Sequence, residues 1–175
     1  MDVKRLGIYL NDHLAGSVGG LELALRTEQE NRSNPVGRYL AAFIPELKHD
    51  QSILKSVMRT LEVPEDALKA RMAWASEKLG RLKLNGSLVR YSPLSRLVEL
   101  EGLCVATEGR LSMWRTLARL STKDARLSGF DFEALIARGE AQQEALQHLR
   151  ARASDVAFTD EPVPFGAGET VVASS

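Results

Sequence analysis

The sequence predicts an all-α protein, a bundle of four long helices with a short extra helix in the crossover between the second and the third. Apolar residues recur at steps of three and four along four separate stretches, which is the period of a helix that buries one face. Asn34-Pro35 and Ser92-Pro93 each place a capping side chain directly before a proline, as at the start of a helix.

Length and the C-terminal stretch predict the domain organisation. The chain has 175 residues, of which 44% are hydrophobic, so it has the size of one domain and can bury one core. We expect a single helical domain over residues 1–158. Residues 159–175 contain two prolines and show no helical period, so we expect an extended or flexible tail there.

Charge and cysteine content bear on partners and compartment. The 23 basic and 23 acidic residues cancel, so the net charge gives no attraction to nucleic acid or to an anionic membrane. No apolar run reaches the roughly 20 residues that span a bilayer. The single cysteine, Cys104, lies among apolar residues, which favours a buried thiol and fits a reducing compartment. We expect a cytoplasmic protein, and dimerisation through helix faces if Trp74 or Trp114 lies exposed.

The first two predicted helices cover residues 3–31 and 35–61. In the second, apolar residues occupy every position of a seven-residue pattern except one, which Asp50 holds. An unpaired carboxylate in a core is costly or becomes protonated, so Asp50 needs a partner. Pro45 removes a backbone hydrogen bond inside this helix, and we expect a kink or a break near residues 42–44.

The central predicted helix covers residues 92–121 and follows a shorter helix between residues 63 and 85. At about 100° per residue, Glu101 and Glu108 fall on one arc with several apolar residues, so we expect both to point inward, whereas Glu99 points elsewhere. The first arc holds Leu94, Leu97, Cys104, Val105 and Leu111, and a second apolar strip holds Leu100, Leu103, Trp114 and Leu117.

The last predicted helix covers residues 130–157. Ser128 and Asp131, three residues later, resemble a capping box with Asp in place of Glu. The inner stripe of this helix includes Gln142 and Gln143, so we expect the polar residues on its buried side to be glutamines.

This layout resembles the ferritin-like bundles, in which two antiparallel helices, a long crossover and two further antiparallel helices give an up-down-down-up order. The likeness extends over residues 3–157. It is strengthened by Glu46-Leu-Lys-His49 in the second helix and by the inward glutamates expected in the central one. The stretch EKLGRLKLNGSLVRYSPLSRLVELEGL is similar to a bacterial group of that superfamily that has no assigned activity.

The resemblance implies a candidate metal site. In the metal-binding members, glutamates and Glu-x-x-His pairs from four helices surround two irons. Glu46 and His49 have the spacing of one such pair, but Gln143 stands three positions after Glu140, and glutamine is a poor iron ligand. The implied di-iron motif is therefore incomplete. The candidate metal ligands are Glu46, Asp50, Glu101 and Glu108, with His13 and His49 as further candidates.

Two function hypotheses follow. In the first, the protein is not an enzyme, holds no cofactor and has a binding or structural role, and its polar core residues bond to arginines or to one another. In the second, the carboxylates bind iron or manganese and the protein acts in oxidoreduction or metal storage, as the resemblance implies. We favour the first because the ligand set is incomplete; a small-molecule pocket and a basic partner surface are further hypotheses. The polar core residues in the first hypothesis are His13, Asp50, Glu101, Glu108 and Gln143.

Overall fold

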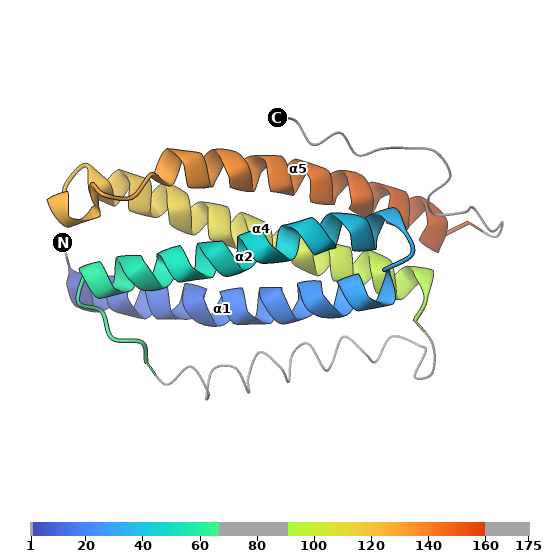
Figure 1. Cartoon of the computed structure of the whole chain (residues 1–175), viewed down its shortest axis with the longest axis horizontal. Helices are drawn as coiled ribbons and strands as arrows, with labels where there is room; N and C mark the ends of the chain where they lie inside the picture. Colours follow the sequence, from blue (N-terminus) through green and yellow to red (C-terminus); the bar gives the residue numbers. More distant parts are fainter. Residues whose placement is uncertain (1, 67–90, 160–175) are drawn as a thin grey trace.

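The computed structural model describes residues 2–66 and 91–159, and its long helices lie side by side along one axis (Figure 1). A 3-10 turn, η2, separates the last two of them. The described residues contain no strand, which confirms the predicted all-α class. The elements are α1, Val3–Glu30; α2, Pro35–Thr60; α4, Pro93–Ser121; η2, Ala125–Leu127; and α5, Phe132–Ala157.

The helices α2 and α4 start where the cap and proline pairs predict. Asn34 Oδ1 accepts the backbone N–H of Val36 at 2.9 Å, and Ser92 Oγ accepts the backbone N–H of Ser95 at 3.1 Å. Each cap satisfies an amide that the helix itself leaves without a partner, and the proline that follows has no N–H to satisfy. The predicted starts of both helices are therefore confirmed.

The start of α5 differs from the prediction. Asp131 alone is its cap, with Oδ1 accepting the N–H of Ala134 at 2.9 Å. Ser128 closes the preceding turn η2, and its hydroxyl donates to the carbonyl of Ala125 at 2.8 Å. The predicted capping box is wrong because Ser128 is the C-terminal cap of the 3-10 turn η2 and does not cap α5.

Pro45 does not interrupt α2, which is a continuous helix from Pro35 to Thr60. A proline inside a helix costs about 3 kcal/mol, through the lost hydrogen bond and the clash of its ring with the preceding turn. Pro45 lies on the exposed side, while the neighbouring Phe43 and Ile44 are buried. Burial of these side chains offsets the cost, so the break that the sequence predicts near residues 42–44 is wrong.

Contacts between helices fix their directions. Arg26 pairs with Glu99 at one end of α1, and Tyr9 bonds to Thr116 at the other, so α4 runs antiparallel to α1. The pairing of Asp50 with Arg138 and of Glu46 with Gln142 likewise makes α5 antiparallel to α2. The most extensive contacts join α4 to α5 and α1 to α2, and α1 also packs against α4.

The apolar core has two halves, one near each end of the bundle. The first surrounds Trp114 and draws on α1 near Leu10, on α2 after Leu54 and on the start of α5. The second surrounds Leu100 and draws on the start of α2, on α4 before residue 105 and on the end of α5. The middle of the bundle, between these halves, is where charged side chains and a cavity lie.

The buried face of α4 is not the predicted one. Glu101 and Glu108 lie on its exposed side together with Val105, whose side chain is 74% exposed. Glu99, which the sequence analysis turns away from the core, is buried and 8% exposed. Because α4 packs on both α1 and α5, its buried surface centres on the strip that contains Leu100 and on the positions beside it. The predicted inward direction of Glu101 and Glu108 is therefore wrong.

Three sequence-based predictions fall wholly or mostly on residues outside the described ones. They are the short helix between residues 63 and 85, of which only residues 63–66 are described and are not helical, the tail after residue 159 and any exposure of Trp74. Trp114, in contrast, is fully buried and belongs to the core. Among the described residues, no helix combines the length and the apolar character needed to cross a membrane.

Candidate functional site

Asp50 lies in the middle of the bundle and is 4% exposed. Arg138 of α5 donates from Nη2 to Asp50 Oδ1, and Arg110 of α4 places Nη1 3.2 Å from Asp50 Oδ2. Each carboxylate oxygen therefore faces a guanidinium group. The prediction that Asp50 occupies a core position and needs a partner is confirmed, and the partners are two arginines.

Gln142 of α5 extends this arrangement. Its Oε1 accepts a hydrogen bond from Arg110 Nη2, and its Nε2 donates to Glu46 Oε2. We call Glu46, Asp50, Arg110, Arg138 and Gln142 the polar layer. Two carboxylates and two guanidinium groups make its formal charge zero, and the predicted glutamine on the buried side of α5 is confirmed at Gln142.

Burial dominates the electrostatics of the polar layer. Loss of hydration raises the pKa of Asp50, while the charges of Arg110 and Arg138 act in the opposite direction. Loss of hydration also lowers the pKa of Arg110 against the effect of Asp50. The guanidinium of Arg110 lies over the ring of Phe43, 5.6 Å from its centroid, which is a favourable cation–π distance.

Several buried donors of this region lack a hydrogen-bond partner within the described part of the chain. They include Nε and Nη1 of Arg110 and Nε1 of Trp114. Arg110 Nη1 has Asp50 Oδ2 at ion-pair distance, but the angles are not those of a hydrogen bond. Buried donors nearly always make a hydrogen bond in folded proteins, and a buried donor without an acceptor costs free energy. Less than 1 Å² of each of these atoms is accessible to water, so the surrounding side chains cover them and leave no room for an acceptor from solvent.

A cavity of about 290 Å³ lies beside the polar layer, between α1, α2 and α4. Glycines from two helices contribute to its wall: Gly16 and Gly20 from α1, and Gly102 and Gly109 from α4. Large side chains form the inner wall. The remaining lining residues are Asp12, His13, Ser17, Phe43, Leu47, Asp50, Gln51, Leu54, Leu103, Val105, Ala106, Thr107, Arg110, Met113 and Trp114.

His13 lines this cavity and is partly buried. Its ring makes an edge-on contact with Tyr9, with the two centroids 4.5 Å apart. Burial lowers the pKa of His13, and the neighbouring carboxylate of Asp12 opposes that shift without reversing it. The imidazole is therefore mainly uncharged near neutral pH.

The structure does not bring the predicted metal ligands together. Glu46 and Asp50 share the polar layer, but Glu101 and Glu108 lie on the exposed face of α4, where Glu108 pairs with Arg115 at 3.2 Å. The predicted place of these two glutamates in a buried network is wrong. His49 is also exposed. Across residues 2–66 and 91–159, no group of three or more His, Cys, Asp or Glu side chains has a geometry that could hold a metal ion.

The predicted burial of the Cys104 thiol is confirmed. Its side chain belongs to the half of the core around Leu100 and is 5% exposed. Loss of hydration raises its pKa, so the thiol stays protonated and unreactive near neutral pH. Cys104 therefore packs as a small apolar residue.

A second polar cluster, which the sequence analysis missed, holds the start of α4 against the turn between α1 and α2. Glu99 accepts hydrogen bonds from Arg26 Nε and from the Tyr91 hydroxyl, both at 3.0 Å. The buried side chain of Asn31 donates to the Tyr91 oxygen at 2.6 Å and accepts from Arg96 Nε at 2.6 Å. These hydrogen bonds join the end of α1, the turn after it and the start of α4.

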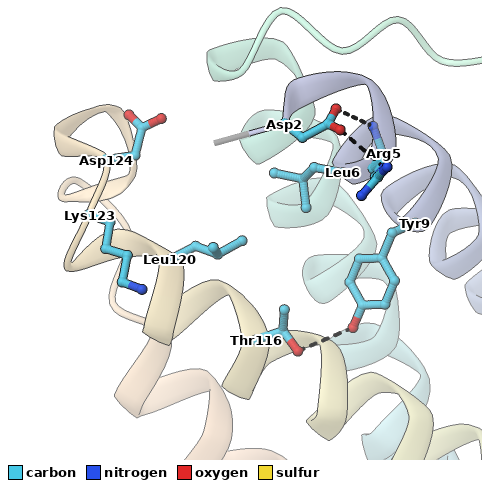
Figure 2. Close-up of a pocket in the computed structure, with 8 residues that line it drawn as sticks. All are labelled: Asp2, Arg5, Leu6, Tyr9, Thr116, Leu120, Lys123 and Asp124. Atoms are coloured by element: carbon cyan, nitrogen blue, oxygen red, sulfur yellow. Dashed lines mark hydrogen bonds and ion pairs between the residues drawn. The ribbon is translucent and has the colours of Figure 1, made fainter.

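A larger hollow of about 560 Å³ lies between the start of α1 and the end of α4 (Figure 2). Figure 2 shows Leu6 and Leu120 extending toward each other across it, and the Tyr9 hydroxyl donating to Thr116 Oγ1 at 3.4 Å. None of its described lining residues has a buried polar atom without a partner. Its lining residues are Asp2, Arg5, Leu6, Tyr9, Thr116, Leu120, Lys123 and Asp124.

Part of the site escapes sequence analysis. Arg110 and Arg138 carry no signal of burial, because arginine on a helix is ordinarily a surface residue. One available signal is the spacing of Arg138 and Gln142, which are four residues apart and therefore share a face of α5. Comparison of the chain with protein-family models, with curated proteins and with solved structures gave no match.

Proposed function

We propose that this protein is a ferritin-like, up-down-down-up bundle with a non-catalytic role, either binding or structural, in which the polar layer occupies the middle of the bundle. The directions of the helices support the topology, since α4 is antiparallel to α1 and α5 is antiparallel to α2. The resemblance of the helix order to that superfamily supports it as well.

The pairing of Asp50 with two arginines is the observation that carries the functional part of the proposal. A metal ion at Asp50 would lie close to two guanidinium groups and would compete with them for the same carboxylate oxygens. The carboxylates of the layer are already balanced in charge. Buried pairs of this kind cost more in lost hydration than an apolar core does, and fixing the register of helices is a role that such pairs can serve.

The compartment and the partners belong to the same proposal. A protein whose one cysteine is buried and unpaired fits a reducing cytoplasm. We propose a homodimer through helix faces, and the exposed apolar side chains of the described helices include Ile8 and Val105. A molar mass from light scattering that stays at the monomer value across concentrations would argue against the dimer.

Elemental analysis tests the non-catalytic role against the metal-dependent alternative. Protein purified without chelator, and protein loaded with iron(II) or manganese(II) and then desalted, are measured beside Asp50→Ala and Glu108→Ala variants. Glu108→Ala is the matched control because this carboxylate lies on the exposed face of α4. We expect far less than one metal ion per chain in every sample. Near-stoichiometric metal that Asp50→Ala loses and Glu108→Ala retains would overturn the proposal in favour of a metal protein.

A further inference from the structure

The side of α1 that points away from the bundle core is buried. Leu6, Leu10 and Leu14 turn the other side of the helix toward the core. At about 100° per residue, Asn11 and Ala15 project away from these leucines, yet Asn11 is 3% exposed and Ala15 is 9% exposed. Ala15 packs into neither half of the apolar core. Its burial therefore requires another part of the chain over this side. We call Asn11, Ala15, Gly19 and Glu22 the outer face of α1.

The chain that leaves α2 is fastened to the outer face. Asn11 Oδ1 accepts the backbone N–H of Asp66 at 3.0 Å, and Asn11 Nδ2 donates to the carbonyl of Pro64 at 3.1 Å. One turn earlier in α1, a Cβ atom added at Gly7 would lie 3.3 Å from Cγ1 of Val63. The chain up to residue 66 therefore runs against the first half of α1.

The chain returns at the opposite end of the same helix. Tyr91 accepts a hydrogen bond at its hydroxyl oxygen from Asn31 Nδ2, at 2.6 Å. At a rise of 1.5 Å per residue, Asn11 and Asn31 are about 30 Å apart along α1. Residues 67–90 connect these two points. A helix of that length spans about 36 Å and an extended chain about 80 Å, so a helical path along α1 fits both ends without slack.

The sequence of residues 67–90 fits a place on this face. Its apolar residues recur at steps of four and three, which is the period of a helix that buries one side. It carries six basic residues and one acidic residue, while the outer face of α1 carries Glu22. Residues 160–175 contain three acidic residues and no Lys or Arg, so Glu22 would repel them. The apolar residues of the period are Leu68, Met72, Ala75, Leu79 and Leu82.

We propose that the outer face of α1 is a docking surface for residues 67–90 of the same chain, which run along it in the same direction as α1. Asn11 holds one end of the connection and Asn31 holds the other. Ala15 and Gly19 have little side-chain volume, so they let the apolar residues of the segment approach closely. The proposal goes beyond the role of the polar layer and does not depend on it.

A spin label on the outer face tests which part of the chain lies there. Glu22→Cys in the full chain carries a nitroxide, which broadens the NMR signals of nearby amides. Ala141→Cys is the matched control, because Ala141 is exposed on α5, a helix that does not contact α1. Cys104 is 5% exposed, and mass spectrometry of wild-type protein checks that it takes no label. Each sample is measured with the nitroxide oxidised and reduced.

We expect the label at Glu22→Cys to remove most of the intensity of amide signals within residues 67–90, and the label at Ala141→Cys to leave them at full intensity. A 1:1 mixture of spin-labelled chain without nitrogen-15 and unlabelled nitrogen-15 chain should show no such loss. Full intensity throughout residues 67–90 would overturn the proposal. Loss at residues 160–175 in their place would assign the face to the C-terminal stretch, and loss in the mixture would assign it to a second copy.

A substitution at the centre of the outer face gives a second, independent measurement. Ala15→Arg places a long cation where the basic segment docks, and Ala141→Arg is the same change at an exposed position of α5. We expect Ala15→Arg to speed amide hydrogen exchange in residues 67–90 at least about tenfold, with α2 and α5 unchanged. Ala141→Arg should have no effect on this segment. Equal exchange in both variants and wild type, or acceleration of all helices alike in Ala15→Arg, would contradict the docking surface.

Discussion

His13 lies at the wall of the cavity, where burial lowers its pKa from the value of 6.5 that it has in an unfolded chain. Between the folded-state pKa and 6.5, the unfolded chain therefore binds more protons than the folded one. Stability rises with pH across that window and is lost as the pH falls from about 6.5 through the folded-state pKa. We expect the wild-type protein to become less stable over this range and a His13→Gln variant to lose that part of the dependence.

Urea unfolding at a series of pH values between 5 and 8 measures this contribution as the difference between wild type and variant. His148→Gln is the control, because His148 is exposed at the surface of α5. The difference between His13→Gln and wild type should change with pH and then level off above about pH 7. A difference that is constant over the whole range would show that His13 takes up its proton equally in both states.

Among single residues, the sequence predicts Asp50 correctly, because it interrupts a run of apolar positions on one face of a helix. The same logic cannot identify its partners. Arg110 and Arg138 are flexible, and only the distance between α2, α4 and α5 decides that both reach one carboxylate. Glu99 is missed for a similar reason, since its burial depends on Arg26 of α1, 73 positions away in the chain.

At the scale of helices, the turn between α1 and α2 depends on a close backbone approach at Gly37. A Cβ atom there would lie 2.2 Å from the carbonyl oxygen of Asn31 and 2.8 Å from the Cα of Arg32. Backbone atoms cannot move aside cheaply, and Asn31 is itself held in the second polar cluster. We expect Gly37→Ala to destabilise the protein by about 1–3 kcal/mol, although alanine favours the helix.

Gly16→Ala is the matched comparison, because Gly16 is also a helical glycine but has no atom within 4 Å of an added Cβ. It should stabilise the protein by up to about 1 kcal/mol through helix propensity alone. Free energies of unfolding in urea give both values. Equal effects of the two substitutions would mean that the turn relaxes around the added methyl group and that the approach at Gly37 is not required.

Helix ends are predictable from the sequence and helix faces are less so. Asn34, Ser92 and the prolines after them act within one turn, so local chemistry suffices to place the starts of α2 and α4. The face that α4 buries depends on which two helices it touches. With apolar residues on two strips, a helical wheel cannot choose between them, and Glu101 was assigned to the wrong side.

At the scale of the whole molecule, the polar layer divides the core into two apolar halves and joins α2, α4 and α5 at one level. An apolar pair of helices can slide by a turn with little loss of contact, whereas Asp50 meets both arginines in only one register. Charged groups buried in this way cost free energy in lost hydration, so under the proposed structural role they specify the arrangement more than they strengthen it.

A variant with an apolar middle tests whether the polar layer sets the register at a cost in stability. The fourfold variant leaves no buried member of the polar layer without its partner, because Glu46 is exposed enough to turn toward water. It combines Asp50→Leu, Arg110→Met, Arg138→Met and Gln142→Leu. Replacing a buried ionic group in this way is often neutral or stabilising by about 1–4 kcal/mol. We expect a free energy of unfolding at least equal to that of the wild type, but broader amide signals in proton–nitrogen spectra because several helix registers are populated. Asp50→Ala alone leaves both arginines without their carboxylate and should lower the free energy of unfolding by about 3–5 kcal/mol, whichever role the layer has. If the fourfold variant is less stable than the wild type yet has sharp signals, the layer strengthens the fold and does not set its register.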